Sequence, residues 1–429
     1  MVLEGRHRRA DRYASLKNRH KHCEKRIDGR LNCDASPENR IAVDHLSEVL
    51  KILDGALRAN ASMAANYAGL LADKLEETGN RQQARQIRER LSRAPTALAT
   101  AQSAENGITL NNLPVDGESR LHTVDVSQPE VRDVGLVLPS AIESRVQEFL
   151  SSVRHHDALV RANAALPNRL LMHGPPGTGK TQLARWVAAQ LGLQLLTVRC
   201  DTLVSSLLGQ TSRNLRRVFE YAEQRPCVLF LDEFDALAGA RGNERDVGEL
   251  QRVVIALLQN MDALPDSTIL LAATNHDQLL DLAVWRRFSF RLPMPLPDEL
   301  VRETLWQRFL DTYAPANINF KTLVARSEGL TGAAIEQVCL DSKRSAVLAG
   351  QAQVDEDEVF RRLGLTLALI ERVPLSTQDA EMAWLRRWDR KIFSLRVLAK
   401  LYGVSTRHVT NITQEGGTDG HEEDDKQSG

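Results

Sequence analysis

The chain has 429 residues, and its 55 Lys and Arg residues nearly balance its 56 Asp and Glu residues, which gives a formal net charge of -1. Hydrophobic residues make up 42% and charged residues 26% of the sequence, values typical of a soluble globular protein that exclude a mainly disordered one. Five cysteines without regular spacing argue against a disulfide-stapled secreted fold, and no apolar run reaches the ~18 residues that span a bilayer. We therefore expect a cytoplasmic protein that does not enter a membrane.

The chain ahead of residue 134 falls into three parts of different composition. Residues 1–35 are polar and basic and are expected to be disordered. They include His20, His22, Cys23 and Cys33, whose spacing matches no common zinc site. Residues 36–93 carry apolar positions at helical spacing and predict a small helical module, which suits a structural cap and a docking domain equally. Residues 94–133 contain scattered Pro, Gly and Asn with weak periodicity, and they predict a linker.

From residue 134 to 296, short apolar runs alternate with helical patterns, and this alternation predicts an α/β domain with a parallel sheet. The stretch 297–371 is rich in helical patterns and predicts a small helical domain. Residues 380–414 predict a helical hairpin, and the Gly-rich, acidic residues 415–429 predict a disordered tail. The predicted fold class is therefore α/β, with helical parts at both ends.

The most specific motif matches the phosphate-binding loop pattern in full and consists of Gly174, Pro175, Pro176, Gly177, Thr178, Gly179, Lys180 and Thr181. It follows a strand pattern at 169–172 and opens a helical pattern at 182–191, which is the context that such a loop requires. The glycines let backbone amides point at phosphate oxygens, Lys180 would neutralise phosphate charge, and the Thr181 hydroxyl would ligate Mg²⁺. The loop therefore predicts a nucleotide site that uses Mg²⁺.

Two later strand patterns end in polar residues. The apolar run 227–231 leads to Asp232 and Glu233, at the carboxyl end of a strand, where ligand sites of α/β sheets lie. Asp232 would hold Mg²⁺, and Glu233 would activate the attacking water. The run 269–273 leads to Asn275, whose neutral amide would orient that water without adding charge.

Taken together, residues from about 134 to 370 resemble the AAA branch of the AAA+ ATPases. The likeness rests on the phosphate-binding loop, the Asp-Glu strand end, Ala-Thr-Asn at 273–275, Arg-Arg-Phe at 286–288 and Gly-Leu-Thr-Gly at 329–332. It implies an α/β domain that hydrolyses ATP, a helical lid over 297–371, and a homo-oligomeric ring, usually a hexamer, with active sites between subunits.

The resemblance also implies roles for single residues. Asn275 is the sensor residue, and Arg286 and Arg287 are arginine fingers that act on a neighbouring subunit, although two arginines alone would also suit a solvated helix end. Gly135 would lie beside the adenine. From the lid, Gly332 and Ala333 would close over the nucleotide.

One position departs from the family pattern. Family members that thread polypeptide generally place an aromatic residue in the pore loop, where this chain has Leu207 followed by Leu208. Leucine lacks the large flat surface of an aromatic ring. This departure argues against strong processive unfolding and leaves ATP hydrolysis unaffected.

The stretch 395–412 resembles a helix-turn-helix, with Gly403 at the turn and Ser405 as the N-cap of the second helix. Residues 386–408 carry seven Lys and Arg against one Asp, a charge pattern that suits phosphate contacts. The exposed side of the second helix supplies the candidate DNA contacts, Thr406, Arg407, His408, Thr410 and Asn411. The same hairpin would also suit packing on the lid or binding to protein.

The sequence as a whole predicts an Mg²⁺-dependent ATPase ring that remodels or unfolds a protein client, similar to the bacterial AAA ATPases that accompany subtilisin-like proteases. The alternative is a DNA-associated ATPase or regulator that docks through residues 380–414. A scaffold whose assembly is switched by nucleotide is a third hypothesis.

Overall fold

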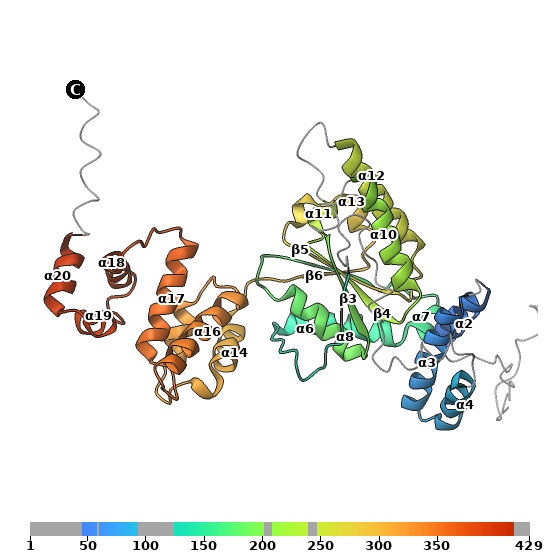
Figure 1. Ribbon diagram of the computed structural model, residues 1–429, viewed down its shortest axis with the longest axis horizontal. Helices are drawn as coiled ribbons and strands as arrows, with labels where there is room; N and C mark the ends of the chain where they lie inside the picture. The colour runs from blue at the N-terminus through green and yellow to red at the C-terminus, as the bar shows by residue number, and fades with distance from the viewer. Residues whose placement is uncertain (1–44, 58–59, 93–123, 201–207, 239–246, 416–429) are drawn as a thin grey trace, which may run out of the picture. The chain divides into compact units, whose positions relative to one another are not determined.

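The computed structural model describes residues 45–57, 60–92, 124–200, 208–238 and 247–415 (Figure 1). The predictions for residues 1–35, including the His and Cys cluster, lie outside these ranges. So do the predictions for Leu207 and for the tail after residue 415. None of the described helices is long and apolar enough to cross a membrane.

Six strands form one sheet in the order β1-β3-β4-β5-β2-β6. They are β1 (Val124–Ser127), β2 (Arg169–His173), β3 (Gln194–Arg199), β4 (Cys227–Asp232), β5 (Ile269–Thr274) and β6 (Phe290–Pro293). Strand β1 runs antiparallel to β3, and the remaining neighbours are parallel. This mostly parallel sheet confirms the predicted α/β class.

Apolar side chains alternate along β4 between the two faces of the sheet, because successive residues of a strand point in opposite directions. Leu229 and Leu231 join one buried core, whereas Val228 and Phe230 join the core on the other face. The helices of this domain are α6 (Ser140–Arg154), α7 (His156–Arg161), α8 (Lys180–Leu191), α10 (Leu208–Glu223), α11 (Asp235–Ala238), α12 (Val247–Ala263), η2 (Asp277–Leu279) and α13 (Leu282–Trp285). Residues of α10 and α12 build the first core, and residues of α6 and α8 build the second.

Strand β1 corrects the prediction of a linker over 94–133. Residues 124–127 pair with β3, with Val124 opposite Val198, and Val124 is buried in the first core. A four-residue strand is too short to produce a recognisable periodicity, and the Pro and Gly residues around it favour a linker. The linker prediction is therefore wrong for these four residues.

The helices after the sheet share one apolar core. They are α14 (Glu299–Leu310), η3 (Asp311–Tyr313), α15 (Phe320–Arg326), α16 (Gly332–Leu348), α17 (Glu356–Ile370), α18 (Gln378–Trp388), α19 (Leu395–Tyr402) and α20 (Thr406–Glu415). Trp306 and Phe360 from the earlier helices and Phe393 and Val409 from the later part all belong to this core. The C-terminal helices therefore pack on the helices of the predicted lid.

The turn between α19 and α20 has the geometry that the sequence predicts. Gly403 has a φ of +66°, the left-handed region that glycine adopts without strain. The Ser405 hydroxyl accepts a hydrogen bond of 3.2 Å from the amide of His408, so Ser405 caps α20.

Among the described residues, three helices precede the sheet: α2 (Leu46–Leu57), α3 (Ala61–Glu77) and α4 (Arg81–Ser92). We call them the helical module. Gly55 of α2 lies against Ala64 of α3, where a Cβ on residue 55 would come within 2.7 Å of the Ala64 nitrogen. The Tyr67 hydroxyl lies 3.0 Å from the carbonyl oxygen of Glu223 and 3.2 Å from that of Arg225, at the connection between α10 and β4. These contacts attach the module to the α/β domain.

Candidate nucleotide site

The loop between β2 and α8 has the backbone that the glycine pattern predicts. Gly174, Gly177 and Gly179 have φ values of +144°, +74° and +93°. A Cβ on Gly174 would lie 2.2 Å from the carbonyl oxygen of Met294, so this position has no room for a side chain. No side chain caps the N-terminus of α8, which therefore offers its amides to an anion.

Lys180 opens α8 and is 8% exposed. Its ammonium donates hydrogen bonds to the carbonyl oxygens of Gly174 and Pro175, at 2.7 and 2.8 Å. Burial lowers the pKa of Lys180 from its ordinary value, and the nearby carboxylates of Asp232 and Asp235 oppose that shift. The cation is thus desolvated, and the hydrogen bonds that it donates to described residues go to neutral carbonyls, which suits the binding of an anion.

The Thr181 hydroxyl and the Asp232 carboxylate meet beside the loop. Thr181 Oγ1 donates a hydrogen bond of 3.0 Å to Asp232 Oδ2, although the two residues belong to α8 and β4. The amide of Glu233 donates to the other carboxylate oxygen, Asp232 Oδ1, at 3.0 Å. A hydroxyl and a carboxylate oxygen at this distance are ligands of the kind that Mg²⁺ prefers, so the pair fits the predicted metal.

Glu233 has a strained backbone. Its φ is +52°, which is uncommon for a residue other than glycine and costs of order 1–3 kcal/mol. The next residue, Phe234, donates its amide to the carbonyl oxygen of Ala273 at 2.8 Å, and this bond holds the turn after β4. The exposed Glu233 lines the cavity described below, beside Asp232.

Asn275 follows β5 and lines the same cavity. Asp235 supports this strand end, because its Oδ1 accepts hydrogen bonds from the Thr274 hydroxyl at 2.8 Å and from the Asn275 amide at 3.4 Å. Asp235 is not among the site residues that the sequence motifs predict. The signal available in the sequence is its position three residues after Asp232, at the start of α11.

The lid helix α16 begins at the phosphate-binding loop. The amide of Ala333 donates a hydrogen bond of 3.2 Å to the carbonyl oxygen of Gly177. Thr331 caps the helix by accepting a hydrogen bond from the Ala334 amide at 3.2 Å. Gly332 and Ala333 both line the cavity, so the structure brings them together with the loop.

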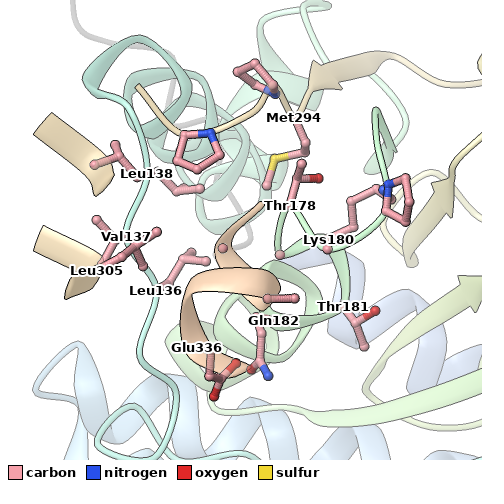
Figure 2. Close-up of a pocket in the computed structure, with 18 of the residues that line it drawn as sticks. Leu136, Val137, Leu138, Thr178, Lys180, Thr181, Gln182, Met294, Leu305 and Glu336 are labelled. Carbon is pink, nitrogen blue, oxygen red and sulfur yellow. The ribbon is translucent and has the colours of Figure 1, made fainter. Parts of the chain in front are cut away.

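A cavity of about 370 Å³ joins these groups (Figure 2). One part of its wall is polar and contains Thr178, Lys180, Thr181, Asp232, Glu233 and Asn275. The other part is apolar and contains Leu136, Val137, Leu138, Ile142, Met294, Val301, Leu305 and Phe309. A polar end for phosphates and an apolar end for a base suit a nucleotide.

Gly135 lines the cavity beside Leu136 and Val137, and the lid approaches it closely. A Cβ on Gly135 would lie 1.7 Å from a guanidinium nitrogen of Arg308 on α14. The apolar contribution of α14, from Val301, Leu305 and Phe309, was missed by the sequence analysis, since those residues have the spacing of any core-facing helix.

Arg286 and Arg287 do not line this cavity. Arg287 donates two hydrogen bonds to the carboxylate of Asp262, at 2.8 and 2.7 Å, and a third to the Ala283 carbonyl oxygen at 2.8 Å. Arg286 is exposed, and its side chain has no hydrogen bond or ion pair with another described residue. The Arg287 side chain is therefore held by its own chain, whereas the Arg286 side chain is available to contact a neighbouring molecule.

The other predicted contacts lie elsewhere. Leu208 begins α10, directly after residues outside the described range. On α20, Thr406, Arg407, His408 and Asn411 are exposed and Thr410 is half-buried. His408 Nε2 lies 3.2 Å from a carboxylate oxygen of Asp379 on α18.

The chain is similar to a known family of ATPases in sequence. Residues 170–296 match the family model described as "ATPase family associated with various cellular activities (AAA)". The chain is 35% identical over 294 residues to "Uncharacterized AAA family ATPase y4kL" of Sinorhizobium fredii, a match that covers 68% of this chain and 87% of that protein.

Two longer relatives also match the chain. The "Cell division cycle protein 48 homolog" of Archaeoglobus fulgidus is 30% identical over 300 residues, which cover 63% of this chain and 41% of that protein. The "ATP-dependent zinc metalloprotease FtsH 1" of Salinibacter ruber is 31% identical over 246 residues, which cover 56% of this chain and 35% of that protein. The chain thus spans most of the first relative and less than half of each of these two.

Proposed function

The chain belongs to the AAA family of ATPases and hydrolyses ATP, and we propose that it does so with Mg²⁺, as a ring, to remodel a protein client. The observation that carries the proposal is the cavity that gathers the phosphate-binding loop, Asp232, Glu233, Asn275 and the start of lid helix α16.

The loop and Lys180 bind the phosphates of ATP. The amides at the N-terminus of α8 face the β- and γ-phosphate oxygens, where the helix dipole adds to their attraction. Lys180 exchanges its hydrogen bonds to Gly174 and Pro175 for bonds to phosphate. Because this cation has already lost most of its water, little further desolvation opposes the exchange.

Thr181 and Asp232 would hold Mg²⁺, and the charge of that ion would neutralise the phosphate oxygens. Glu233 accepts a proton from the water whose oxygen forms the new bond to the γ-phosphorus, while the bond to the ADP oxygen breaks. Asn275 orients that water through its side-chain amide. Asp235 positions Asn275 by holding the backbone at the end of β5.

Arg286 of one subunit contributes to the active site of the next. A guanidinium suits this task, because it is planar and permanently charged. The exposure of Arg286 supports the role, and the pairing of Arg287 with Asp262 supports a second role in holding the 286–288 segment. The ring, most simply a hexamer, follows from this need for a neighbour.

A protein client is favoured by the relatives. One of them is named an ATP-dependent zinc metalloprotease, a protein that by its name uses ATP and acts on proteins. A partnership with a separate protease is a narrower form of the same proposal. Leu207 and Leu208 would contact the client from the pore loop.

DNA is the alternative partner, and the exposure of Arg407 and Asn411 on α20 is the observation that favours it. Two of the basic side chains near α20 already bind to groups within the chain. Lys400 pairs with Asp355 and Asp357, at 3.2 and 3.1 Å. Arg386 donates to two backbone carbonyl oxygens, so the positive surface is smaller than the count of residues suggests.

The test measures ATP turnover by the full chain with and without a permanently unfolded protein, and with and without duplex DNA. We expect the unfolded protein to raise turnover, Leu207→Ala to reduce that rise, and Arg407→Ala to leave it unchanged. Stimulation by DNA alone, lost in Arg407→Ala and at high salt, would instead establish the alternative. Point substitutions are needed here because deleting residues 380–414 would remove part of the lid core.

A further inference from the structure

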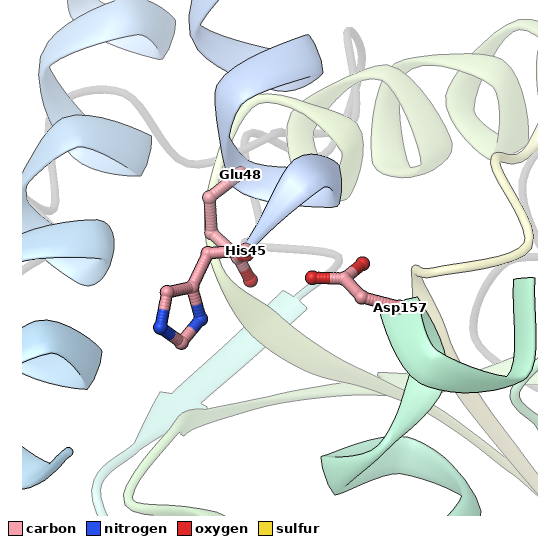
Figure 3. Close-up of side chains that lie close together, drawn as sticks. All are labelled: His45, Glu48 and Asp157. Carbon is pink, nitrogen blue, oxygen red and sulfur yellow. The ribbon is translucent and has the colours of Figure 1, made fainter. Parts of the chain in front are cut away.

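A second cavity of about 810 Å³ lies between the helical module and the α/β domain. We propose that His45, Glu48 and Asp157 on its wall bind one Zn²⁺ ion, which fastens the module to the ATPase domain (Figure 3). None of these three residues lines the nucleotide cavity. The site is therefore separate from ATP hydrolysis, and its role is structural.

The three side chains come from two parts of the fold. His45 precedes α2 and Glu48 lies in the first turn of that helix, whereas Asp157 lies in the first turn of α7. Their ligand atoms all lie within 4.8 Å of one another. Two ligands of a tetrahedral zinc ion are ~3.4 Å apart, so small rotations of the side chains would complete the geometry.

Both carboxylates are already oriented by neighbouring groups. Glu48 accepts hydrogen bonds from the Lys74 ammonium and, at 3.1 Å, from the Ser47 hydroxyl. Asp157 accepts the Ser47 amide at 3.2 Å through Oδ1, which leaves its Oδ2 for a metal. Each carboxylate oxygen has two lone pairs, so these bonds leave ligand capacity, and such outer partners are typical of metal sites.

His156, on the wall of the same cavity, provides an independent observation. It is 8% exposed, and its Nδ1 has no hydrogen-bond partner among the described residues. A buried imidazole nitrogen needs a hydrogen-bond partner, and none of the described residues supplies one to this Nδ1. A water on the fourth position of the ion would supply that partner from the cavity.

The donor set selects the ion. An imidazole nitrogen with two carboxylates suits Zn²⁺, whereas Mg²⁺ and Ca²⁺ prefer oxygen ligands alone. Zn²⁺ would add to the Lys74 ammonium in offsetting the charge of Glu48, a carboxylate that is only 5% exposed. Since the ligands come from both sides of the boundary, binding of the ion would favour the docked position of the module.

The experiment measures Zn²⁺ binding to the chelator-treated full chain by equilibrium dialysis and elemental analysis, without nucleotide or Mg²⁺. We expect one ion at this site and a loss of affinity of at least about 100-fold in both His45→Ala and Asp157→Asn. With Co²⁺ in place of Zn²⁺, the tetrahedral absorption bands should appear in the wild type and vanish in Asp157→Asn.

Matched controls separate this site from the rest of the chain. His155→Ala removes a neighbouring histidine whose Nδ1 lies 2.9 Å from the Ser151 carbonyl oxygen, and Asp73→Asn removes another acid of the same cavity. Both should bind Zn²⁺ as the wild type does, as should Asp232→Asn and the double variant Cys23→Ser/Cys33→Ser. Wild-type affinity in His45→Ala and Asp157→Asn, with circular dichroism showing that both are folded, would overturn the proposal, as would a wild type that binds no ion.

Discussion

The amide of Ala333 donates a hydrogen bond of 3.2 Å to the carbonyl oxygen of Gly177 and so joins lid helix α16 to the phosphate-binding loop. Gly177 has a φ of +74°, and a Cβ there would lie 2.9 Å from Thr331 Oγ1. The lid therefore rests on the loop at a residue that has no side chain. A change in the conformation of the loop when phosphate binds or leaves would therefore move the start of α16 directly.

This contact predicts that Gly177→Ala weakens ATP binding and that Gly192→Ala does not. Gly192 also has a positive φ, +64°, but a Cβ there would meet no atom within 4 Å. Both variants should lose about 1 kcal/mol of unfolding free energy to backbone strain. Only Gly177→Ala should raise the dissociation constant for ATP, by at least about tenfold, because its methyl group pushes the lid away. Equal dissociation constants in the two variants, measured by calorimetry, would show that the lid contact has no role in binding.

Replacing the buried Lys180 should change ATP binding and the free energy of unfolding in opposite directions. We expect Lys180→Met to lose ATP binding and yet, without nucleotide, to exceed the wild type in unfolding free energy by about 1 kcal/mol. The pKa of Lys180 is lowered by burial, so the folded state disfavours the charged form. The wild type is therefore destabilised below the lowered pKa and recovers as the pH rises toward the ordinary lysine value of 10.5. Denaturant titrations at several pH values test this, and a gap that widens with pH would contradict it.

The two arginines after α13 should behave differently. Arg286→Ala is expected to lower turnover by about 10³-fold at unchanged stability, since its side chain has no described partner. Mixing Arg286→Ala with Lys180→Met should restore part of the activity, because a mixed ring contains interfaces with one intact site and one intact arginine. Absence of any recovery in mixtures shown to co-assemble would argue against action on a neighbouring subunit.

Arg287→Ala should mainly affect stability. Arg287 lowers the pKa of Asp262 through their hydrogen bonds, so the pair stabilises the fold above the ordinary carboxylate value of 3.8 and loses that effect as the pH falls through the lowered pKa. Because Asp262 is 54% exposed, we expect a loss of about 1 kcal/mol or less at pH 7. Thermal unfolding at pH 7 and pH 3 tests the sign, since the difference from the wild type should shrink at the lower pH.

The parts of the site that the sequence predicted are those that a short run of residues encodes. A buried strand followed by a polar turn is visible at Asp232 and at Asn275, and the glycines of the loop have conformations that few other residues adopt. These features depend on neighbours in the sequence. They could therefore be assigned without knowledge of the fold.

The features that were missed depend on contacts between distant residues. The apolar end of the cavity needs Leu305 from the lid, and the support of β5 needs Asp235 from the start of α11. The number of basic residues in the C-terminal hairpin overstates its free positive charge, because Lys400 pairs with Asp355, 45 residues away in the sequence. In α2, the helical spacing of Leu50 and Leu53 predicts that they face a core. In the structure, however, their side chains are 50% and 52% exposed.

The most direct test of the account is ATP binding and hydrolysis by Glu233→Gln. This change keeps the shape of the side chain and removes the base, so we expect a dissociation constant for ATP within about threefold of the wild type and turnover lowered by at least about 100-fold. Glu336→Gln, a change to another carboxylate on the cavity wall, is the matched control and should keep most of the turnover. Turnover close to that of the wild type in Glu233→Gln would contradict the assignment of this cavity as the site of ATP hydrolysis.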